Sequence, residues 1–236
     1  MTDLQTLKET YQHISSDSST ADRIVFGRAL LTQNTPEFLD FHYSLLKETA
    51  IDTQLYETIC RKFSERAEVG ELYLLTQITA EPDPHMQAIA LHILGTYKYK
   101  NGKHLDKTAG LARNYLTATV AVLRAKALFV IGWVGLPSDI DQIAALLAHD
   151  PVPENRSWAA TALMQLCFNH PEAAATCLQI LRDALSSQNA WHTECAILVS
   201  MQEISGKKWG LDATDMHANT TEQLAKAKEK AMKLKI

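Results

Sequence analysis

The sequence contains few of the residues that interrupt helices, with 9 glycines and 7 prolines in 236 residues. All-β folds need frequent turns built on glycine and proline, and low-complexity segments are rich in both, so both classes are disfavoured. Apolar residues make up 46% of the chain and charged residues 21%. This composition is typical of a globular protein with a substantial core, and it favours helices.

Long apolar runs are also missing. No run approaches the ~18 residues that a membrane span requires, and residues 1–9 lack the apolar core of a secretory signal peptide. We therefore expect neither a membrane segment nor export by the general signal. The cysteines form no C-x-x-C pair and lie within apolar helical patterns, which is typical of reduced, buried thiols and favours a cytoplasmic location. These cysteines are Cys60, Cys167, Cys177 and Cys195.

An excess of positive charge is absent as well. Twenty-three basic residues stand against 27 acidic ones, a formal net charge of −4, so no global positive field attracts a phosphate backbone. Nucleic acid is therefore disfavoured as a partner. The chain has no phosphate-binding loop, no dinucleotide fingerprint and no G-x-S-x-G nucleophile motif. We expect no catalytic residue, no cofactor and no enzymatic activity.

Nine histidines raise the question of a metal site. Two ligands share a helix face when they are three or four residues apart, and Cys167 with His170 has that spacing. Zinc needs three or four ligands, so we expect no metal. His85 and His92 are interpreted as a solvated or hydrogen-bonded face. The acidic pairs near predicted helix starts are interpreted as capping groups. These pairs are Glu81/Asp83, Asp139/Asp141 and Asp212/Asp215.

Apolar residues recur at three- and four-residue spacing along most of the chain, between short stops that contain Pro, Gly, Asn or Asp. In the first part this predicts helices over residues 4–14, 24–31, 36–49 and 53–63, with Pro36 in a first turn. A final helix over residues 220–235 has a narrow apolar stripe beneath a basic coat. It is typical of the polar helix that caps a repeat array.

From residue 71 onward a period appears. Four similar segments begin at Ala90, Ala127, Ala162 and Ala196, at intervals of 37, 35 and 34 residues. These intervals match a repeat of two helices. Shorter amphipathic helices are predicted between the four segments, over residues 105–115, 138–149 and 171–186. Each repeat is thus predicted to be an outer helix, a turn and an inner helix whose alanines allow close approach of neighbouring backbones.

One unit carries a recognisable pattern. It has a glycine turn at Gly135, an outer helix ending in Leu-Leu, a turn at Asp150-Pro151, then Arg156 and an alanine-rich inner helix. This unit resembles a HEAT-like repeat, including the variant found in phycobilisome lyases and in many bacterial proteins. The resemblance implies an all-α superhelix of antiparallel helix pairs. It also implies that Asp150 and Arg156 tie one repeat to the next, while Ala121 and Ala190 stand where neighbouring repeats have arginine.

The expected organisation is one continuous solenoid domain. Residues 1–70 form an N-terminal helical cap or degenerate repeats, residues 71–210 form the HEAT-like repeats, and residues 211–236 form the C-terminal capping helix. Whether the first 70 residues continue the solenoid is left open.

A stripe of aromatic and basic residues is predicted on the inner helices, facing away from the alanines. Protein interfaces concentrate their binding energy in Trp, Tyr and Arg, so this stripe is a candidate surface for another protein. The stripe comprises Ile89, His92, Lys126, Phe129, Trp133, Arg156, Thr161, Phe168, Trp191 and Gln202. The candidate partner-binding residues are His92, Lys126, Phe129, Trp133, Arg156 and Trp191. Because large aromatics usually lie in cores, Trp133 and Trp158 are alternatively interpreted as filling joints between repeats.

These features predict a non-enzymatic module that sequesters or positions another protein on its concave face, as a bacterial immunity protein or adaptor. Two alternatives stay open. HEAT-like chains of this length include DNA glycosylases for alkylated bases and phycobilin lyases; the glycosylases require a basic groove, and the one notable internal lysine cluster spans residues 98–107. The chain is alternatively a structural subunit of a larger helical assembly.

Overall fold

The computed structural model describes residues 3–14, 19–48, 53–187 and 190–236. Within these ranges the chain forms thirteen α-helices and four short 3-10 helices, and no strand. The predicted all-α class is therefore confirmed, while the HEAT-like superhelix stays a prediction. The chain divides into two compact units, residues 1–108 and residues 109–236, with the boundary inside α7 (Leu105–Tyr115). The predicted segments 1–70, 71–210 and 211–236 also stay a prediction.

Unit 1 is built from the first six helices and one 3-10 helix. They are α1 (Leu4–His13), α2 (Thr20–Leu30), α3 (Pro36–Leu45), α4 (Thr53–Ser64), α5 (Ala67–Ala80), α6 (Pro84–Thr96) and η1 (Tyr97–Lys100). Helix α4 is central, because it packs against α2, α3, α5 and α6. The core around it includes Phe26, Ile59, Phe63 and Leu91, which have no solvent exposure.

Most predicted helices of unit 1 are present, with shifted ends. Helix α2 begins at Thr20 and not at Ile24, because Ser19 and Asp22 form a reciprocal capping box. Helix α3 ends at Leu45, whereas the prediction extends to Thr49, which lies outside the described residues. The earlier start of α2 could not be predicted from apolar periodicity, because its capping residues are polar.

Arg66 joins three parts of unit 1 from a buried position at the start of α5. Its guanidinium donates to the carbonyl oxygens of Leu30 and Gln33 and to Asn34 Oδ1, at 2.5, 2.8 and 2.7 Å. Its Nε donates to His42 Nδ1 at 3.0 Å. All these acceptors are neutral, so dipoles and not a carboxylate stabilise the buried charge.

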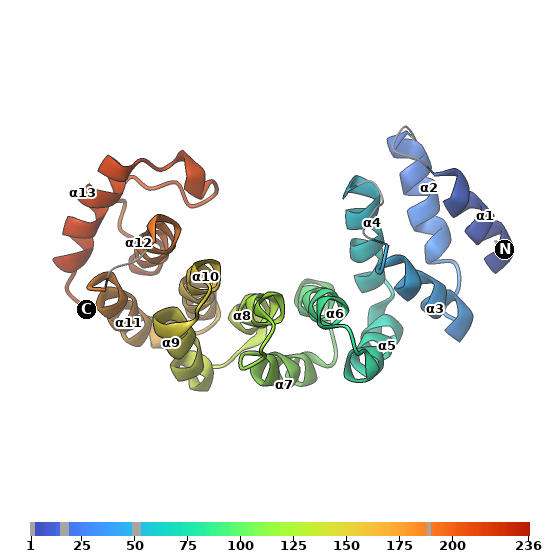
Figure 1. The fold of residues 1–236 in the computed structure, drawn as a ribbon, viewed down its shortest axis with the longest axis horizontal. Helices are drawn as coiled ribbons and strands as arrows, with labels where there is room; N and C mark the ends of the chain where they lie inside the picture. The colour runs from blue at the N-terminus through green and yellow to red at the C-terminus, as the bar shows by residue number, and fades with distance from the viewer. Residues whose placement is uncertain (1–2, 15–18, 49–52, 188–189) are drawn as a thin grey trace. The chain divides into compact units, whose positions relative to one another are not determined.

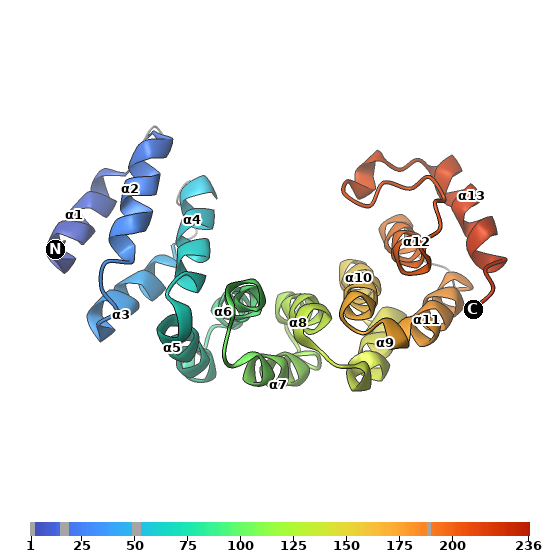
Figure 2. The same ribbon diagram turned by 180° about the vertical axis from the view of Figure 1, so that it is seen from behind.

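Unit 2 contains the following elements after the last residues of α7. They are α8 (Ala121–Val134), η2 (Pro137–Asp139), α9 (Ile140–His149), α10 (Pro153–Asn169), η3 (Pro171–Ala173), α11 (Ala174–Leu185), α12 (Trp191–Ser205), η4 (Met216–Ala218) and α13 (Thr221–Met232). Helix α10 packs against both α8 and α12. Figures 1 and 2 show these three helices in a row, with α9 and α11 on one side of them.

The row of α8, α10 and α12 depends on small residues. The alanines that mark the predicted repeat, Ala127, Ala162 and Ala196, are at most 1% exposed. At Gly132 in α8, an added Cβ would lie 3.0 Å from Ala162 Cα and 2.5 Å from Gln165 Oε1. The backbones of α8 and α10 therefore approach closely, because neither Gly132 nor Ala162 carries a large side chain.

We expect Gly132→Ala to lower the free energy of unfolding of unit 2 by about 1–2 kcal/mol, since the new methyl group overpacks the contact. Gly110→Ala in α7 is the matched control, because an added Cβ there meets no atom within 4 Å. The free energy of unfolding of this control should rise by about 0.5–1 kcal/mol, because alanine has a higher helix propensity than glycine. Urea denaturation of both variants gives the two values. A gain of stability in both would contradict close α8–α10 packing.

Candidate functional site

Three aromatic rings and one ammonium group gather on α8 and α10 in unit 2. The ring of Phe129 lies 4.4 Å from that of Trp133 and 5.2 Å from that of Trp158, both in edge-to-face geometry. Lys126 Nζ stands 5.7 Å from the centroid of the Phe129 ring. We call Lys126, Phe129, Trp133 and Trp158 the aromatic face. Edge-to-face rings with a stacked cation hold one another in a fixed arrangement.

Trp158 is the most exposed ring of this face. It is 38% exposed, whereas the stripe predicted from the sequence leaves it out. Phe168, two to three turns further along α10, is 59% exposed. An apolar ring that contacts other rings on one side and solvent on the other is suited to contact with a second molecule. Trp158 also contacts Phe129 between α8 and α10, so the alternative interpretation of Trp158 as a residue that fills a joint stays a prediction.

A pocket of about 290 Å³ lies beside Trp158. It is lined by side chains from α10, from the start of α12 and from η4. The lining residues, which we call the Trp158 pocket, are Glu154, Ser157, Trp158, Thr161, His192, Met216 and His217. The rings of His192 and His217 are 5.5 Å apart, and His192 also contacts the ring of Trp191 at 5.0 Å. Trp191 thus contacts a lining residue of the pocket but is not itself one of the lining residues.

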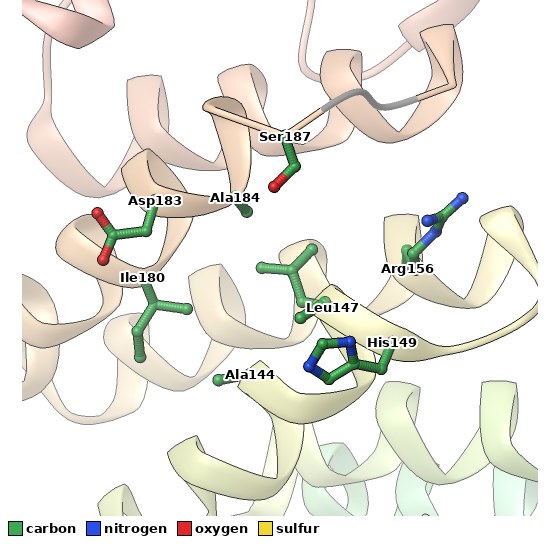
Figure 3. Close-up of a pocket in the computed structure, with 9 residues that line it drawn as sticks. Ala144, Leu147, His149, Arg156, Ile180, Asp183, Ala184 and Ser187 are labelled. Atoms are coloured by element: carbon green, nitrogen blue, oxygen red, sulfur yellow. The ribbon is translucent and has the colours of Figure 1, made fainter.

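Arg156 lies on another side of α10 from Trp158, since two residues along a helix correspond to a rotation of about 200°. It lines a pocket of about 330 Å³ with His149 of α9 and with Ile180 and Asp183 of α11. Figure 3 shows its guanidinium pointing away from Ile180 and Asp183. The Nε atom is buried and has no hydrogen-bond partner in the part of the chain that the structure describes. Arg156 therefore does not join Lys126, Phe129 and Trp133.

Two other members of the predicted stripe also lie elsewhere. His92 belongs to unit 1, where it lines a pocket with Tyr56, Cys60 and Tyr99. Gln202 is buried and accepts hydrogen bonds from the backbone N–H groups of Trp209 and Leu211, so it does not face solvent. Of the predicted stripe, the structure brings the α8 residues together with Trp158, and it places Thr161 in the pocket beside Trp158.

Asp150 is tied to Arg124, a residue that the HEAT-like pattern does not single out. Arg124 Nε and Nη2 donate to the two carboxylate oxygens at 2.7 and 2.9 Å. Arg124 Nη1 donates to the carbonyl oxygens of Ala118 and Thr119. Burial alone would raise the pKa of Asp150, but hydrogen bonds from Arg124, Val152 N and Asn155 outweigh it and lower that pKa. The pair joins the start of α8 to the turn before α10.

The remaining polar groups act mainly as structural partners. Asp83, Asp212 and Asp215 accept hydrogen bonds from backbone N–H groups near helix or turn starts, which confirms the capping interpretation for them. His170 contacts the Gly135 carbonyl oxygen and Glu172. Cys167, Cys177 and Cys195 are buried free thiols, as predicted, and Cys60 is half-buried.

Two further features bear on the function of the described residues. Among the described residues, no group of three His, Cys, Asp or Glu side chains is placed to hold a metal ion. No helix in the described part of the chain is long and apolar enough to cross a membrane.

No protein-family model matches this chain, and no curated protein sequence is significantly similar to it.

Proposed function

We propose that this protein is a non-enzymatic protein-binding module, and that the partner rests on the aromatic face of unit 2. The observation that carries this proposal is the exposed Trp158 ring, fixed by Phe129 and adjacent to a pocket. Rigid aromatic anchors supply a large contact area at a low cost in conformational entropy. The role is that of a bacterial adaptor or immunity protein in the cytoplasm, which holds or sequesters its partner.

The corresponding architecture is a HEAT-like α-α superhelix. The row of α8, α10 and α12, the flanking helices α9 and α11, and the intervals of 37, 35 and 34 residues support it. A short helix pair buries its apolar side only by stacking on a neighbour. Such stacking leaves the opposite side of the inner helices available for a partner, and Trp158 lies on that side.

Site-specific photo-crosslinking in the source organism tests the proposed face. A benzoylphenylalanine side chain is placed at position 158, at position 168 or at position 142 as a control. Gln142 is exposed on α9 and lies outside the aromatic face. We expect one protein, identified by mass spectrometry, to be crosslinked from positions 158 and 168 and not from position 142.

A quantitative measurement completes the test. With the crosslinked protein purified, Trp158→Ala should raise the dissociation constant of the complex about tenfold or more, because interface tryptophans commonly act as hot spots. Gln142→Ala should leave it unchanged. Equal crosslinking from all three positions, or a crosslink to nucleic acid in place of protein, would rule the proposal out.

A further inference from the structure

The Trp158 pocket carries a carboxylate without a partner. Glu154 lines the pocket, is exposed, and makes no hydrogen bond or ion pair within the described residues. The nearby Glu194 is different, because it accepts from Lys228 Nζ at 3.0 Å. Asp215 is also engaged, since it accepts from the His217 backbone N–H. Unlike Glu194 and Asp215, Glu154 is therefore available to pair with a positive charge on a ligand.

The hydroxyl groups of the pocket offer oxygen acceptors. The Thr161 hydroxyl donates its proton to the Ser157 carbonyl oxygen at 3.2 Å. The Ser157 hydroxyl directs its proton towards Pro153 O or Thr193 Oγ1, both at 3.3 Å. Because both protons are used inside the protein, the two oxygens present lone pairs to a ligand. A side chain that only donates hydrogen bonds matches such a lining.

The aromatic wall favours a cation for a second reason. Trp158 presents part of its indole ring to the pocket, and tryptophan is the side chain whose π face attracts cations most strongly. The same cluster already holds Lys126 against Phe129. None of the described residues that line the pocket is lysine or arginine, and the basic side chains among them are the imidazoles of His192 and His217, whose rings contact each other.

We propose that the Trp158 pocket receives a lysine or arginine side chain of the partner protein, packed on the indole of Trp158 and paired with Glu154. This inference rests on the proposed protein-binding function and names the chemistry that the partner presents. Lys and Arg carry donors and no acceptor, and their apolar stems fit beside Met216. An acidic side chain would instead meet the Glu154 carboxylate and would be excluded by repulsion.

Fluorine NMR of the full chain labelled with fluorotryptophan tests this proposal. The four tryptophans give four resonances, and Trp→Phe variants assign them. The probes are acetylated, amidated tripeptides with arginine, lysine, norleucine or glutamate between two glycines. We expect the arginine and lysine peptides to shift the Trp158 resonance, with dissociation constants about tenfold below that of norleucine. The glutamate peptide should cause no shift.

Substitutions separate the charge from the apolar contact. Glu154→Gln should raise the dissociation constant of the arginine peptide about two- to fivefold, the range expected for an exposed ion pair, and leave that of the norleucine peptide unchanged, since it removes the charge and keeps the shape. Asp141→Asn, which removes an exposed acid on α9 outside the pocket, is the control and should change neither. Trp158→Leu lacks the reporting resonance, so its peptide affinities are measured by calorimetry. They should show a reduced preference for arginine over norleucine, whereas Phe168→Leu should preserve the preference.

Three outcomes would overturn the inference. They are norleucine binding as tightly as arginine, an arginine affinity unaffected by Glu154→Gln, and a Trp158 resonance that no basic peptide shifts. If position 158 still crosslinks one protein, none of these outcomes would contradict the proposed function. The partner would then bind without placing a basic side chain in the pocket. Conversely, selective arginine binding without any crosslinked protein would leave the pocket's specificity standing and remove the proposed function.

Discussion

Replacing Arg124 with leucine is expected to lower the free energy of unfolding of unit 2 by about 3–5 kcal/mol, the cost of breaking a buried ion pair at one end. The Asp150 side chain is fully buried, and Arg124 supplies its only charged hydrogen-bond donors among the described residues. The substitution also removes the donors to the Ala118 and Thr119 carbonyl oxygens. The start of α8 and the turn that leads into α10 then keep the neutral link through Asn155 Nδ2, which donates to the Ala121 carbonyl oxygen and to Asp150, but lose the charged one.

Tryptophan fluorescence during guanidinium denaturation reports this effect directly, because all four tryptophans lie in unit 2. Arg113→Leu is a useful comparison. Arg113 donates to Asp139 at 2.6 and 3.0 Å, but its side chain is 31% exposed, so water can replace part of the interaction. We expect a smaller loss for Arg113→Leu than for Arg124→Leu.

The double variant Arg124→Leu with Asp150→Leu isolates the cost of the stranded charge. It should be more stable than Arg124→Leu alone, since no buried carboxylate remains without its partner. A double variant that is less stable than either single variant would mean that the pair contributes mainly through packing.

Acidification from pH 7 to pH 4.5 is expected to remove about 2–3 kcal/mol from the stability of unit 1 through His42 alone. Burial, together with the neighbouring charge of Arg66, lowers the pKa of His42 from 6.5 to about 3. The geometry explains this. Nδ1 accepts from Arg66 Nε at 3.0 Å and Nε2 donates to the Ile59 carbonyl oxygen at 2.9 Å, so a second ring proton has no acceptor.

The loss of stability on acidification follows from the difference in proton binding between the folded and the unfolded chain. Between pH 6.5 and pH 3 the unfolded chain binds a proton at His42 and the folded chain does not, so stability is complete above pH 6.5 and falls with pH by about 1.4 kcal/mol per unit. His42→Gln retains one donor and one acceptor without the titration. Hydrogen exchange of the α4 amides at pH 7 and at pH 4.5 should therefore show a smaller loss of protection in this variant. Equal losses in both proteins would assign the acid sensitivity to other groups.

Local patterns in the sequence predict the helices and their spacing but only part of the candidate site. The alanines at positions 127, 162 and 196 are buried in the row of helices, as their period predicts. The alternative that places Trp158 in a joint between repeats rests on residue type alone, which favours burial for tryptophan. Its actual exposure depends on which side of α10 meets α8, and that rotation is set by contacts distant in the sequence.

The ion pair of Arg124 and the hydrogen bonds of Arg66 could not be predicted from the sequence, for a related reason. Arg124 and Asp150 are 26 residues apart, and Arg66 reaches acceptors up to 36 residues away. No local spacing rule covers such pairs. The resemblance to HEAT-like repeats singles out Arg156 beside Asp150, yet the structure places the ion pair on Arg124 of α8, two helices before α10.

The small and the large residues of α8 and α10 are neighbours on the same helices. Gly132 and Ala162 set how near the two backbones come, and Phe129 and Trp158 lie three and four positions away from them. The rings of Phe129 and Trp158 also contact each other between α8 and α10. A change in the recognition preference of unit 2 at these two positions therefore also changes the packing of its scaffold, so natural variation or engineering has to satisfy both at once.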